Sequence, residues 1–486
     1  MHQETEQQDQ QSEEVRPRRG YPANELRQAL WRIFFAWVFG ASFMAIISGA
    51  TLTYFLTRYL QTDDVSYGLI MAAGPAAVLF FFLGSYVNER TGRIKRNFLI
   101  FVTLHRLLWL GIAAIPLFMH DLPSPIKVML AGCFIFISAA AANFGGAGWI
   151  AWMAEIVPKR MAGAFFGNRA SVGMISMVLT TVVIAWMLDH YPAERWLYAV
   201  VFSVAALIGA VDIIIFTGVR EVPRPVQAKP PSMTEILVTP WKNVVFRSFA
   251  CYTGVSWIAY MIMAPFAWRF CYEPVAKGGL GMSPSQANLA LFIIPLLAMA
   301  LVSPLWGRAI DRFGPKSVLV TSALGAIIFP IGWVVIHHQI VWLIYPLAVL
   351  SGLSWPGIEQ TMAYMQVKGF PDARRTTYCA SFQVVFGLSC VIGTTLGGVM
   401  ASFSATHLGA FHWLPAWVSH YHPLFAISIL LRVLAFFLLL LPMQMPGTAS
   451  VRQVTRTLAS DLVQKLPGLS QRARKKSREK KPEKIR

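Results

Sequence analysis

Charged residues are scarce in this 486-residue sequence, because Asp, Glu, Lys and Arg together make up only 13% of it. A soluble domain typically carries about 25% charged residues. This chain therefore has too few charged residues to cover the surface of a water-soluble enzyme. Acidic residues are fewer still, with 23 Asp and Glu against 42 Lys and Arg, and the net charge is +19. Since 56% of the residues are hydrophobic, that positive charge does not indicate a nucleic-acid-binding protein. The composition predicts an integral membrane protein.

Cysteine is also rare, and the motifs of catalysis are missing. The sequence has no P-loop, no H-E-x-x-H, no G-x-S-x-G and no cluster of His and Cys. We therefore predict no catalytic residue, no metal site and no cofactor, and we do not expect an enzyme. Neither a disulfide framework nor a zinc site is expected from the five scattered cysteines, which are Cys133, Cys251, Cys271, Cys379 and Cys390.

Long apolar stretches are abundant. A membrane-spanning helix needs about 20 mostly apolar residues, and the alternating segments of about ten residues that form membrane β-barrels are absent. The predicted fold class is therefore an all-α integral membrane protein with twelve transmembrane helices. The stretches lie near residues 33–57, 67–87, 98–118, 127–150, 165–188, 196–218, 246–268, 286–306, 317–338, 341–365, 378–403 and 421–444.

The positions of Lys and Arg predict the orientation. Twelve spans place both termini on one side of the membrane, and 34 of the 42 Lys and Arg lie on that side, with five on the other. Loops rich in Lys and Arg stay in the cytoplasm. We therefore expect a multi-pass protein of the cell or inner membrane with both termini cytoplasmic. Residues 1–27 are too polar and too long for the charged leader of a signal peptide, so we expect no cleavable signal before the first span.

Two loops on the same predicted side carry related sequences. The first follows the second span and the other follows the eighth, and their acidic-Arg-x-Gly cores begin 222 residues apart, close to half the chain. Parallel repeats of six spans are a known plan for transporters. The related residues are Glu89, Arg90, Gly92 and Arg93 in the first loop, and Gly307, Asp311, Arg312, Gly314 and Lys316 in the other.

The second of these loops resembles the signature Gly-x-x-x-Asp-Arg-x-Gly-x-Lys/Arg of the major facilitator superfamily. The first matches less well, because Glu89 replaces the Asp and Gly84 lies one residue early. The resemblance implies two pseudo-symmetric six-helix bundles around a central site. The expected parts are a disordered tail (1–28), the N-terminal bundle (29–218), a cytoplasmic loop with a short amphipathic helix (219–245), the C-terminal bundle (246–444) and a basic tail (445–486).

The resemblance also implies that the nine loop residues form a conformational latch on the cytoplasmic side. The glycines permit tight turns beside helix ends, and acidic side chains at the membrane edge can pair with Arg. Such pairs would break when the protein opens inward. The alternative is that these charges only set the topology, because exposed ion pairs often contribute little.

Ionisable residues inside spans are costly and point to function. Glu359 in the tenth span is our main candidate for a proton-accepting coupling site, because the resemblance implies that this span lines the cavity. Arg106 in the third span is a candidate clamp for an anionic substrate, with pairing to a carboxylate as the alternative. Asp212 is an alternative proton-accepting site and Arg432 an alternative clamp for an anion. The resemblance places their spans at the periphery, so a packing role is expected for both. The remaining candidates, with core packing as their alternative, are Trp257, Tyr260, Trp355 and Gln360.

The expected function is secondary active transport of a small solute by alternating access, with H⁺ or Na⁺ as a possible coupling ion and with symport, antiport and uniport left open. Residues 165–188 lack the Gly-Pro-x-x-Gly-Gly signature of some drug/proton antiporters of the family. The alternative is a non-transporting receptor, assembly factor or lipid scramblase. We expect a monomer that binds no nucleic acid, with its basic tail attracted to anionic lipid.

Overall fold

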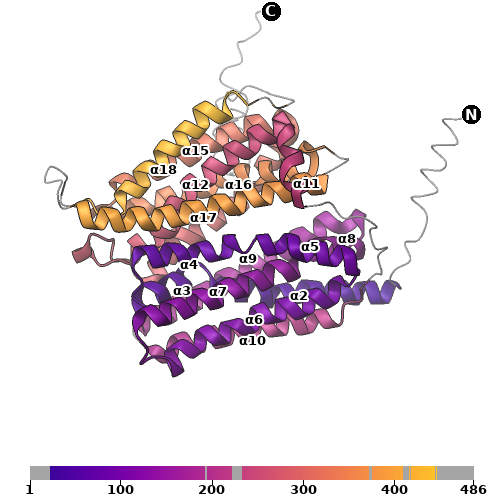
Figure 1. Cartoon of the computed structure of the whole chain (residues 1–486), viewed down its shortest axis with the longest axis horizontal. Helices are drawn as coiled ribbons and strands as arrows, with labels where there is room; N and C mark the ends of the chain where they lie inside the picture. Colours follow the sequence, from indigo (N-terminus) through magenta and orange to yellow (C-terminus); the bar gives the residue numbers. More distant parts are fainter. Residues whose placement is uncertain are drawn as a thin grey trace, which may run out of the picture.

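The computed structural model describes residues 22–191, 194–221, 233–371, 375–408, 415, 417–443 and 445. Within this part of the chain, twelve helices are long and apolar enough to cross a membrane, and no residue forms a β-strand. The predicted all-α class and the predicted number of spans are therefore confirmed. The helices pack as two halves that lie one above the other in Figure 1.

The N-terminal half contains the first six spans, and its first helix begins at Ala23, before the apolar stretch. Helix-forming residues such as Glu25 and Leu26 extend it. The first span is interrupted at Gly49, where φ is 56°, and the second near Pro75. The elements are α2 (Ala23–Ile47), α3 (Gly49–Tyr54), η1 (Phe55–Tyr59), α4 (Asp64–Ala76), α5 (Leu79–Thr91), α6 (Ile94–Phe118), α7 (Ser124–Gly146), α8 (Trp149–Ile156), α9 (Lys159–His190) and α10 (Arg195–Thr217).

The C-terminal half follows a short helix, α11, which lies within the segment 219–245 where the sequence predicts a short helix. The elements are α11 (Met233–Val238), η2 (Thr239–Lys242), α12 (Val244–Tyr272), η3 (Val275–Lys277), α13 (Pro284–Asn288), η4 (Leu289–Ile293), α14 (Ile294–Phe313), α15 (Pro315–Val335), η5 (His338–Leu343), α16 (Ile344–Tyr364), η6 (Met365–Gly369), α17 (Arg375–His407), α18 (His422–Ala435) and η9 (Phe436–Leu440).

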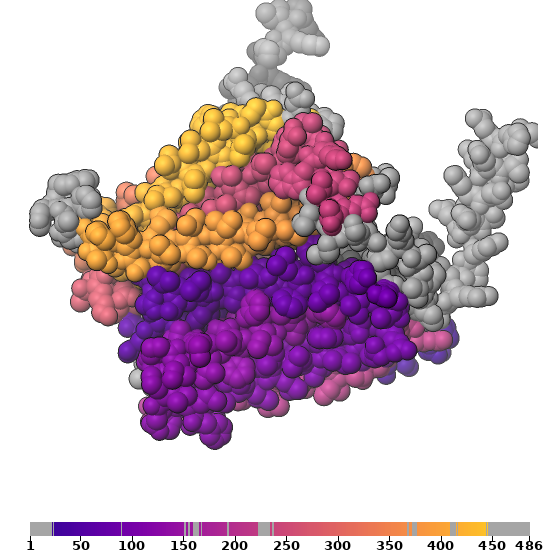
Figure 2. Space-filling view, viewed as in Figure 1, coloured from indigo at the N-terminus to yellow at the C-terminus, as the bar shows by residue number. Residues whose placement is uncertain are grey.

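The two halves contact each other at one end of the molecule and along one side. We call this end the distal end; it holds Tyr59, where the first span ends, and His422, where the twelfth begins. The opposite, terminal end holds Pro22, the first described residue. At the distal end α3 packs against α12 and α13, and α9 packs against α13. Along the side, α4 packs against α17, and Figure 2 shows the orange surface of α17 directly against the N-terminal half.

The hydrophobic cores show the same asymmetry. At the distal end a single core contains residues of both halves, and the rings of Tyr54 and Tyr272 meet there with centroids 5.1 Å apart. At the terminal end each half has its own core, one around Trp152 and the other around Phe249. The halves are therefore joined at the distal end and packed separately at the terminal end.

Two glycines permit a close crossing between α4 and α17. A Cβ atom on Gly398 of α17 would lie 2.6 Å from the backbone oxygen of Asp64, and one on Gly68 of α4 would lie 2.7 Å from that of Thr394. Real Cβ atoms do not approach oxygen so closely, so the two backbones can meet only where both side chains are absent.

Replacing one of these glycines is expected to weaken the contact between the halves. Gly398→Ala forces α4 and α17 apart and should lower the free energy of unfolding by about 1–3 kcal/mol, the usual cost of overpacking. Thermal unfolding of the purified protein measures this loss. The control is Gly74→Ala in α4, whose Cβ would meet no atom within 4 Å. Equal melting temperatures for the two variants would contradict the prediction.

Candidate functional site

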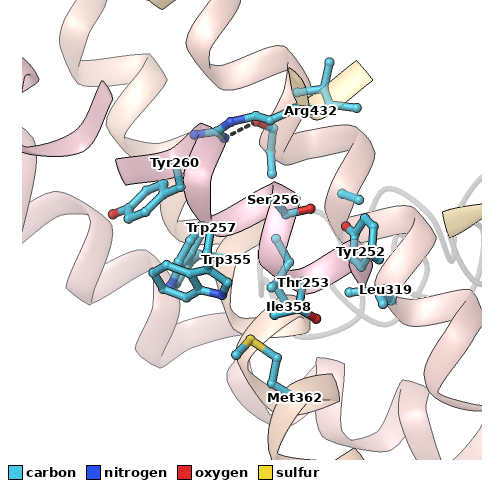
Figure 3. Close-up of a pocket in the computed structure, with 13 residues that line it drawn as sticks. Tyr252, Thr253, Ser256, Trp257, Tyr260, Leu319, Trp355, Ile358, Met362 and Arg432 are labelled. Carbon is cyan, nitrogen blue, oxygen red and sulfur yellow. Dashed lines mark hydrogen bonds between the residues drawn. The ribbon is translucent and has the colours of Figure 1, made fainter. Parts of the chain in front are cut away.

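Three aromatic residues from two spans form a cluster inside the C-terminal half. Trp257 and Tyr260 come from α12 and Trp355 comes from α16, and we call them the aromatic cluster (Figure 3). The ring centroids of Tyr260 and Trp355 are 4.6 Å apart, and Trp257 lies 5.3 Å from Tyr260 and 5.5 Å from Trp355. These are the separations of packed aromatic pairs.

Glu359 lies beside the aromatic cluster. Its carboxylate accepts a hydrogen bond of 2.8 Å from the indole nitrogen of Trp355, one helical turn earlier. Positions i and i+4 share a helix face, so the local sequence of α16 alone brings these two side chains together. The side chain of Glu359 is exposed, whereas Trp355 is half-buried. Glu359 therefore offers a carboxylate at the accessible edge of the cluster.

A cavity of about 250 Å³ opens beside the aromatic cluster. It lies between α12, α14, α15 and α16, and its walls are mainly apolar and aromatic, with Glu359 as the acidic residue among them. Ligand sites commonly combine such walls with a few polar groups. Its lining includes Tyr260, Met263, Trp268, Trp333, Trp355 and Glu359.

Gln360 and Arg106, the remaining candidates, contact other parts of the protein. The Gln360 amide donates a hydrogen bond of 2.8 Å to the backbone oxygen of Ser303, which joins α16 to α14. The Arg106 guanidinium is buried in the N-terminal half, 2.8 Å from the carboxylate of Asp212 and 4.0 Å from the ring centroid of Phe43. The structure brings neither residue to the aromatic cluster.

Two glycines of the related loops have a positive φ, a conformation for which glycine is suited. Gly92 ends α5 with φ 65°, and Gly314 joins α14 to α15 with φ 81°. A side chain would strain the backbone at both positions. Gly307 lies within α14, beside the amide of Gln360. The glycines thus permit the tight turns that the loop sequences predict.

The charged residues of these loops contact their own halves. Arg90 contacts the Tyr86 hydroxyl at 3.4 Å, and Lys316 donates to the backbone oxygen of Leu441 at 2.9 Å. Asp311 and Arg312 are exposed. Among the described residues no ion pair joins these side chains to the other half; Arg93 is exposed and the Glu89 side chain lies outside the described set. The latch therefore stays a prediction for a conformation closed at the terminal end.

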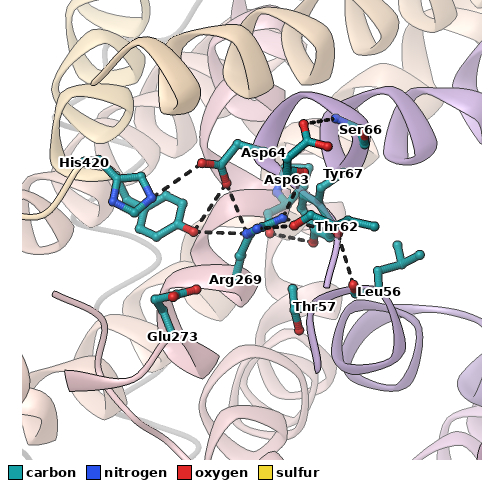
Figure 4. A network of polar contacts seen from close by, with 12 residues as sticks. Leu56, Thr57, Thr62, Asp63, Asp64, Ser66, Tyr67, Arg269, Glu273 and His420 are labelled. Carbon is teal, nitrogen blue, oxygen red and sulfur yellow. Dashed lines mark hydrogen bonds and ion pairs between the residues drawn. The ribbon is translucent and has the colours of Figure 1, made fainter. Parts of the chain in front are cut away.

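A polar network at the distal end was not predicted from the sequence. Its acidic member, Asp64, begins α4, and its Oδ1 lies 3.1 Å from Nε of Arg269, near the end of α12 (Figure 4). The Oδ2 of the same carboxylate lies 3.5 Å from Nε2 of His420. Both Asp64 and Arg269 are about nine-tenths buried. The pair therefore joins the two halves away from bulk water.

Hydrogen bonds complete this network, which we call the distal seal (Thr62, Asp64, Arg269, His420 and Tyr421). Arg269 also donates to the Tyr421 hydroxyl at 3.1 Å and to the backbone oxygen of Thr62. Burial raises the pKa of Tyr421 well above its usual value, so its hydroxyl stays protonated and donates to Asp64 at 3.4 Å. Each polar group of the seal thus has a partner on another element.

Two further contacts across the halves lie near the distal seal. Arg58, at the end of the first span, donates a hydrogen bond of 2.5 Å to the backbone oxygen of Tyr272. The backbone nitrogen of Ser285 in α13 donates to the carboxylate of Asp189 in α9 at 3.3 Å. The first, second and fifth spans are therefore each tied to the C-terminal half at this end.

Comparison with known proteins gives partial matches in sequence. The family model described as Major Facilitator Superfamily matches residues 272–477. The multi-drug resistance efflux pump PmrA homolog of Lactococcus lactis subsp. lactis (strain IL1403) is 25% identical over 167 residues, which are 34% of this chain and 38% of that protein. The tetracycline resistance protein, class H, of Pasteurella multocida is 29% identical over 138 residues, 27% of this chain and 34% of that protein. The match thus spans well under half the length of each relative.

Matches in structure cover nearly the whole chain. A mutant of the nucleoside transporter NupG superimposes with a TM-score of 0.67 at 15% sequence identity. The superposition covers 87% of this chain and 100% of the NupG chain. A bacterial homolog of the human lysosomal transporter Spinster, inward-facing and unoccupied, superimposes with a TM-score of 0.60 at 13% identity, covering 88% and 100%. The family-model match over residues 272–477, the twelve spans and these relatives agree that the chain is similar to the major facilitator superfamily.

Proposed function

We propose that this protein is a secondary active transporter that moves a small solute by alternating access, not an enzyme. One observation carries the proposal: the halves share a hydrophobic core at the distal end only, while each has a separate core at the terminal end. A site between two such halves is open to one side at a time. The relatives, efflux and resistance proteins by name, support the same function.

We further propose that the terminal end faces the cytoplasm and that this conformation is inward-facing. The support is the excess of Lys and Arg in the loops predicted on that side. Residues 29–218 and 246–444 would then move as the two bundles, and the nine loop residues would form the latch when the terminal end closes. The basic tail would lie along anionic lipid of the cytoplasmic leaflet, with the protein acting as a monomer in the cell or inner membrane.

The aromatic cluster and Glu359 form the substrate and coupling site in this proposal. Flat apolar rings would stack on Trp257, Tyr260 and Trp355, and Glu359 would take up and release a proton as the site alternates between the two sides. A receptor, assembly factor or scramblase of the same fold needs no carboxylate beside an aromatic cavity, so the carboxylate favours transport over these alternatives.

Neutralising Glu359 is expected to uncouple transport from the proton gradient. In membrane vesicles with tetracycline as the probe, Glu359→Gln should abolish accumulation driven by the proton gradient. It should also abolish the pH dependence of the rate, because an amide cannot bind the proton. Accumulation is measured between about pH 6 and pH 8.

The control for this experiment is Glu194→Gln, an exposed glutamate at the start of α10, on the distal side. It should transport like the unmodified protein. An unchanged pH dependence in Glu359→Gln would remove Glu359 from the coupling role. If neither protein moves tetracycline, other flat aromatic solutes are tested in the same vesicles before the pH series is repeated.

A further inference from the structure

Arg432 is a buried cation without a counter-ion among the described residues. It comes from α18 into the interior of the C-terminal half and is only 7% exposed. Its Nη1 donates to the backbone oxygen of Ala326 at 2.7 Å, and its Nε donates to the hydroxyl of Ser428 at 3.2 Å. Its Nη2 has no hydrogen-bond partner, and within the described chain no carboxylate lies in ion-pair distance.

In the N-terminal half, by contrast, the buried arginine has an acidic partner. There the third and sixth spans contribute Arg106 and Asp212, which form an ion pair of 2.8 Å. The equivalent ninth and twelfth spans contribute the Ala326 carbonyl and Arg432. A buried charge is strongly unfavourable unless an opposite charge accompanies it. The C-terminal half therefore retains a cation whose partner the described part of the chain does not supply.

A small cavity lies beside this guanidinium. It has a volume of about 40 Å³, and the side chains of Tyr252, Ser256, Trp257 and Tyr260 line it together with Arg432 (Figure 3). A buried water needs about 10–15 Å³ by this measure. The space beside the guanidinium therefore has room for a small polar group of the size of one carboxylate.

The small cavity borders the larger one at the aromatic cluster. Tyr260 and Trp355 line both cavities, and the Arg432 guanidinium carbon lies 5.6 Å from the ring centroid of Tyr260. A molecule with a flat ring in the larger cavity can thus place a short acidic substituent beside the guanidinium.

We propose that Arg432 binds the carboxylate of the substrate, so that the transported class is flat aromatic monocarboxylates. This inference rests on the proposed transport function and names its substrate class. The free Nη2 donates to one carboxylate oxygen, and the hydroxyls of Tyr252 and Ser256 are further donors in the cavity lining. The ring stacks on the aromatic cluster. Arginine suits this role because its planar guanidinium matches the geometry of a carboxylate.

Binding to the purified full-length protein tests the proposal with three probes that share one ring. Indole-3-acetate carries a carboxylate, indole-3-acetamide has the same shape without charge, and tryptamine carries an ammonium. We expect indole-3-acetate to bind about ten- to a hundredfold more tightly than the acetamide, the usual effect of a hydrogen bond to a charged group. Ligand-induced thermal stabilisation and calorimetry measure the affinities.

Variants of Arg432 connect this preference to the site. Arg432→Gln should reduce the affinity for indole-3-acetate to that for the acetamide, and Arg432→Lys should retain part of the difference because it keeps the charge. Both variants remove the hydrogen bond from the Arg432 guanidinium to Ala326. Binding that is retained in Arg432→Lys therefore shows that loss of this bond does not unfold the protein. The exposed Arg308→Gln in α14 is the matched control and should bind like the unmodified protein.

Three results would overturn the proposal. The first is equal affinity for indole-3-acetate and indole-3-acetamide. The second is tighter binding of tryptamine than of indole-3-acetate. The third is an undiminished preference of Arg432→Gln for indole-3-acetate over indole-3-acetamide. Stabilisation by sodium chloride alone that disappears in Arg432→Gln would assign the site to an inorganic anion and would also overturn it. The distal cross-linking described below reports alternating access without any ligand, so failure of this proposal is distinguishable from failure of the transport function.

Discussion

Replacing Arg269 by alanine is expected to open the distal end of the protein. The change leaves the Asp64 carboxylate nine-tenths buried without its guanidinium partner and removes the bonds to Tyr421 and to the backbone of Thr62. Removing one member of a buried pair is more costly than removing both, because the remaining charge stays out of water. The conformation in which the distal end is open to water therefore becomes more favourable.

The size of this shift follows from the contacts that are lost. His420 remains beside Asp64 and lowers the cost, and the shared distal core still favours closure. A net change of about 1.4 kcal/mol or more in the equilibrium between the two conformations corresponds to about tenfold or more in their ratio. Asp64→Asn keeps the shape of the side chain and should shift the equilibrium in the same direction by less.

Disulfide cross-linking across the distal end measures this equilibrium. In a background without the five native cysteines, Asp189→Cys and Ser285→Cys place thiols on α9 and α13, which are in contact in the closed conformation. The rate of cross-linking should be high in this background and should fall about tenfold when Arg269→Ala is added. No substrate is needed.

The control is Lys277→Gln, an exposed residue of the same end that pairs only with Glu273 of its own half. It should leave the rate unchanged. A rate that stays the same in Arg269→Ala and in Asp64→Asn would indicate that the two halves do not separate at this end. The protein would then be a rigid scaffold, and the receptor or assembly-factor interpretation would be favoured over transport.

The spans could be predicted from the sequence because each is a continuous apolar stretch whose length is set by the membrane. The contact of Trp355 with Glu359 is likewise local, since four residues along one helix define it. The interruption of the first span at Gly49 was not predicted, because a single glycine within a long apolar stretch is also compatible with an unbroken helix.

The distal seal could not be predicted because its partners are distant in sequence. Asp64 and Arg269 are separated by most of the N-terminal half, and both fall at span ends, where charged residues are common. A signal was nevertheless present: the predicted topology places the start of the second span and the end of the seventh on the same side. Opposite charges at those two positions were compatible with a bridge, but only the packing of α4 and α12 in three dimensions selects it.

Breaking the buried pair in the N-terminal half is expected to cause the largest loss of stability. Arg106 and Asp212 are 2.8 Å apart with side chains that are 8% and 6% exposed. Two glycines make room for them, because a Cβ on Gly209 would lie 2.6 Å from Arg106 and one on Gly40 would lie 2.9 Å from Asp212. Packing of the first, third and sixth spans is thus built around this pair.

Asp212→Leu should lower the free energy of unfolding by about 3–5 kcal/mol, the cost of leaving one buried charge unpaired. Arg106→Leu should cost less, because Arg169 also acts electrostatically on Asp212 and remains as a partial counter-ion. The double replacement, Arg106→Leu with Asp212→Leu, should recover most of the loss, since leucine pairs of similar volume often match a buried ion pair in stability.

Equilibrium unfolding in mixed micelles, followed by tryptophan fluorescence, gives the four free energies of the double-mutant cycle. The cycle should show a large positive coupling between the two positions, whereas Arg308→Gln on the exposed surface should show none with either. If the double variant were as unstable as the sum of the single ones, the two side chains would be acting independently. The pair would then not be what holds the third span to the sixth, and the apolar contacts of α6 with α10 would have to account for that packing.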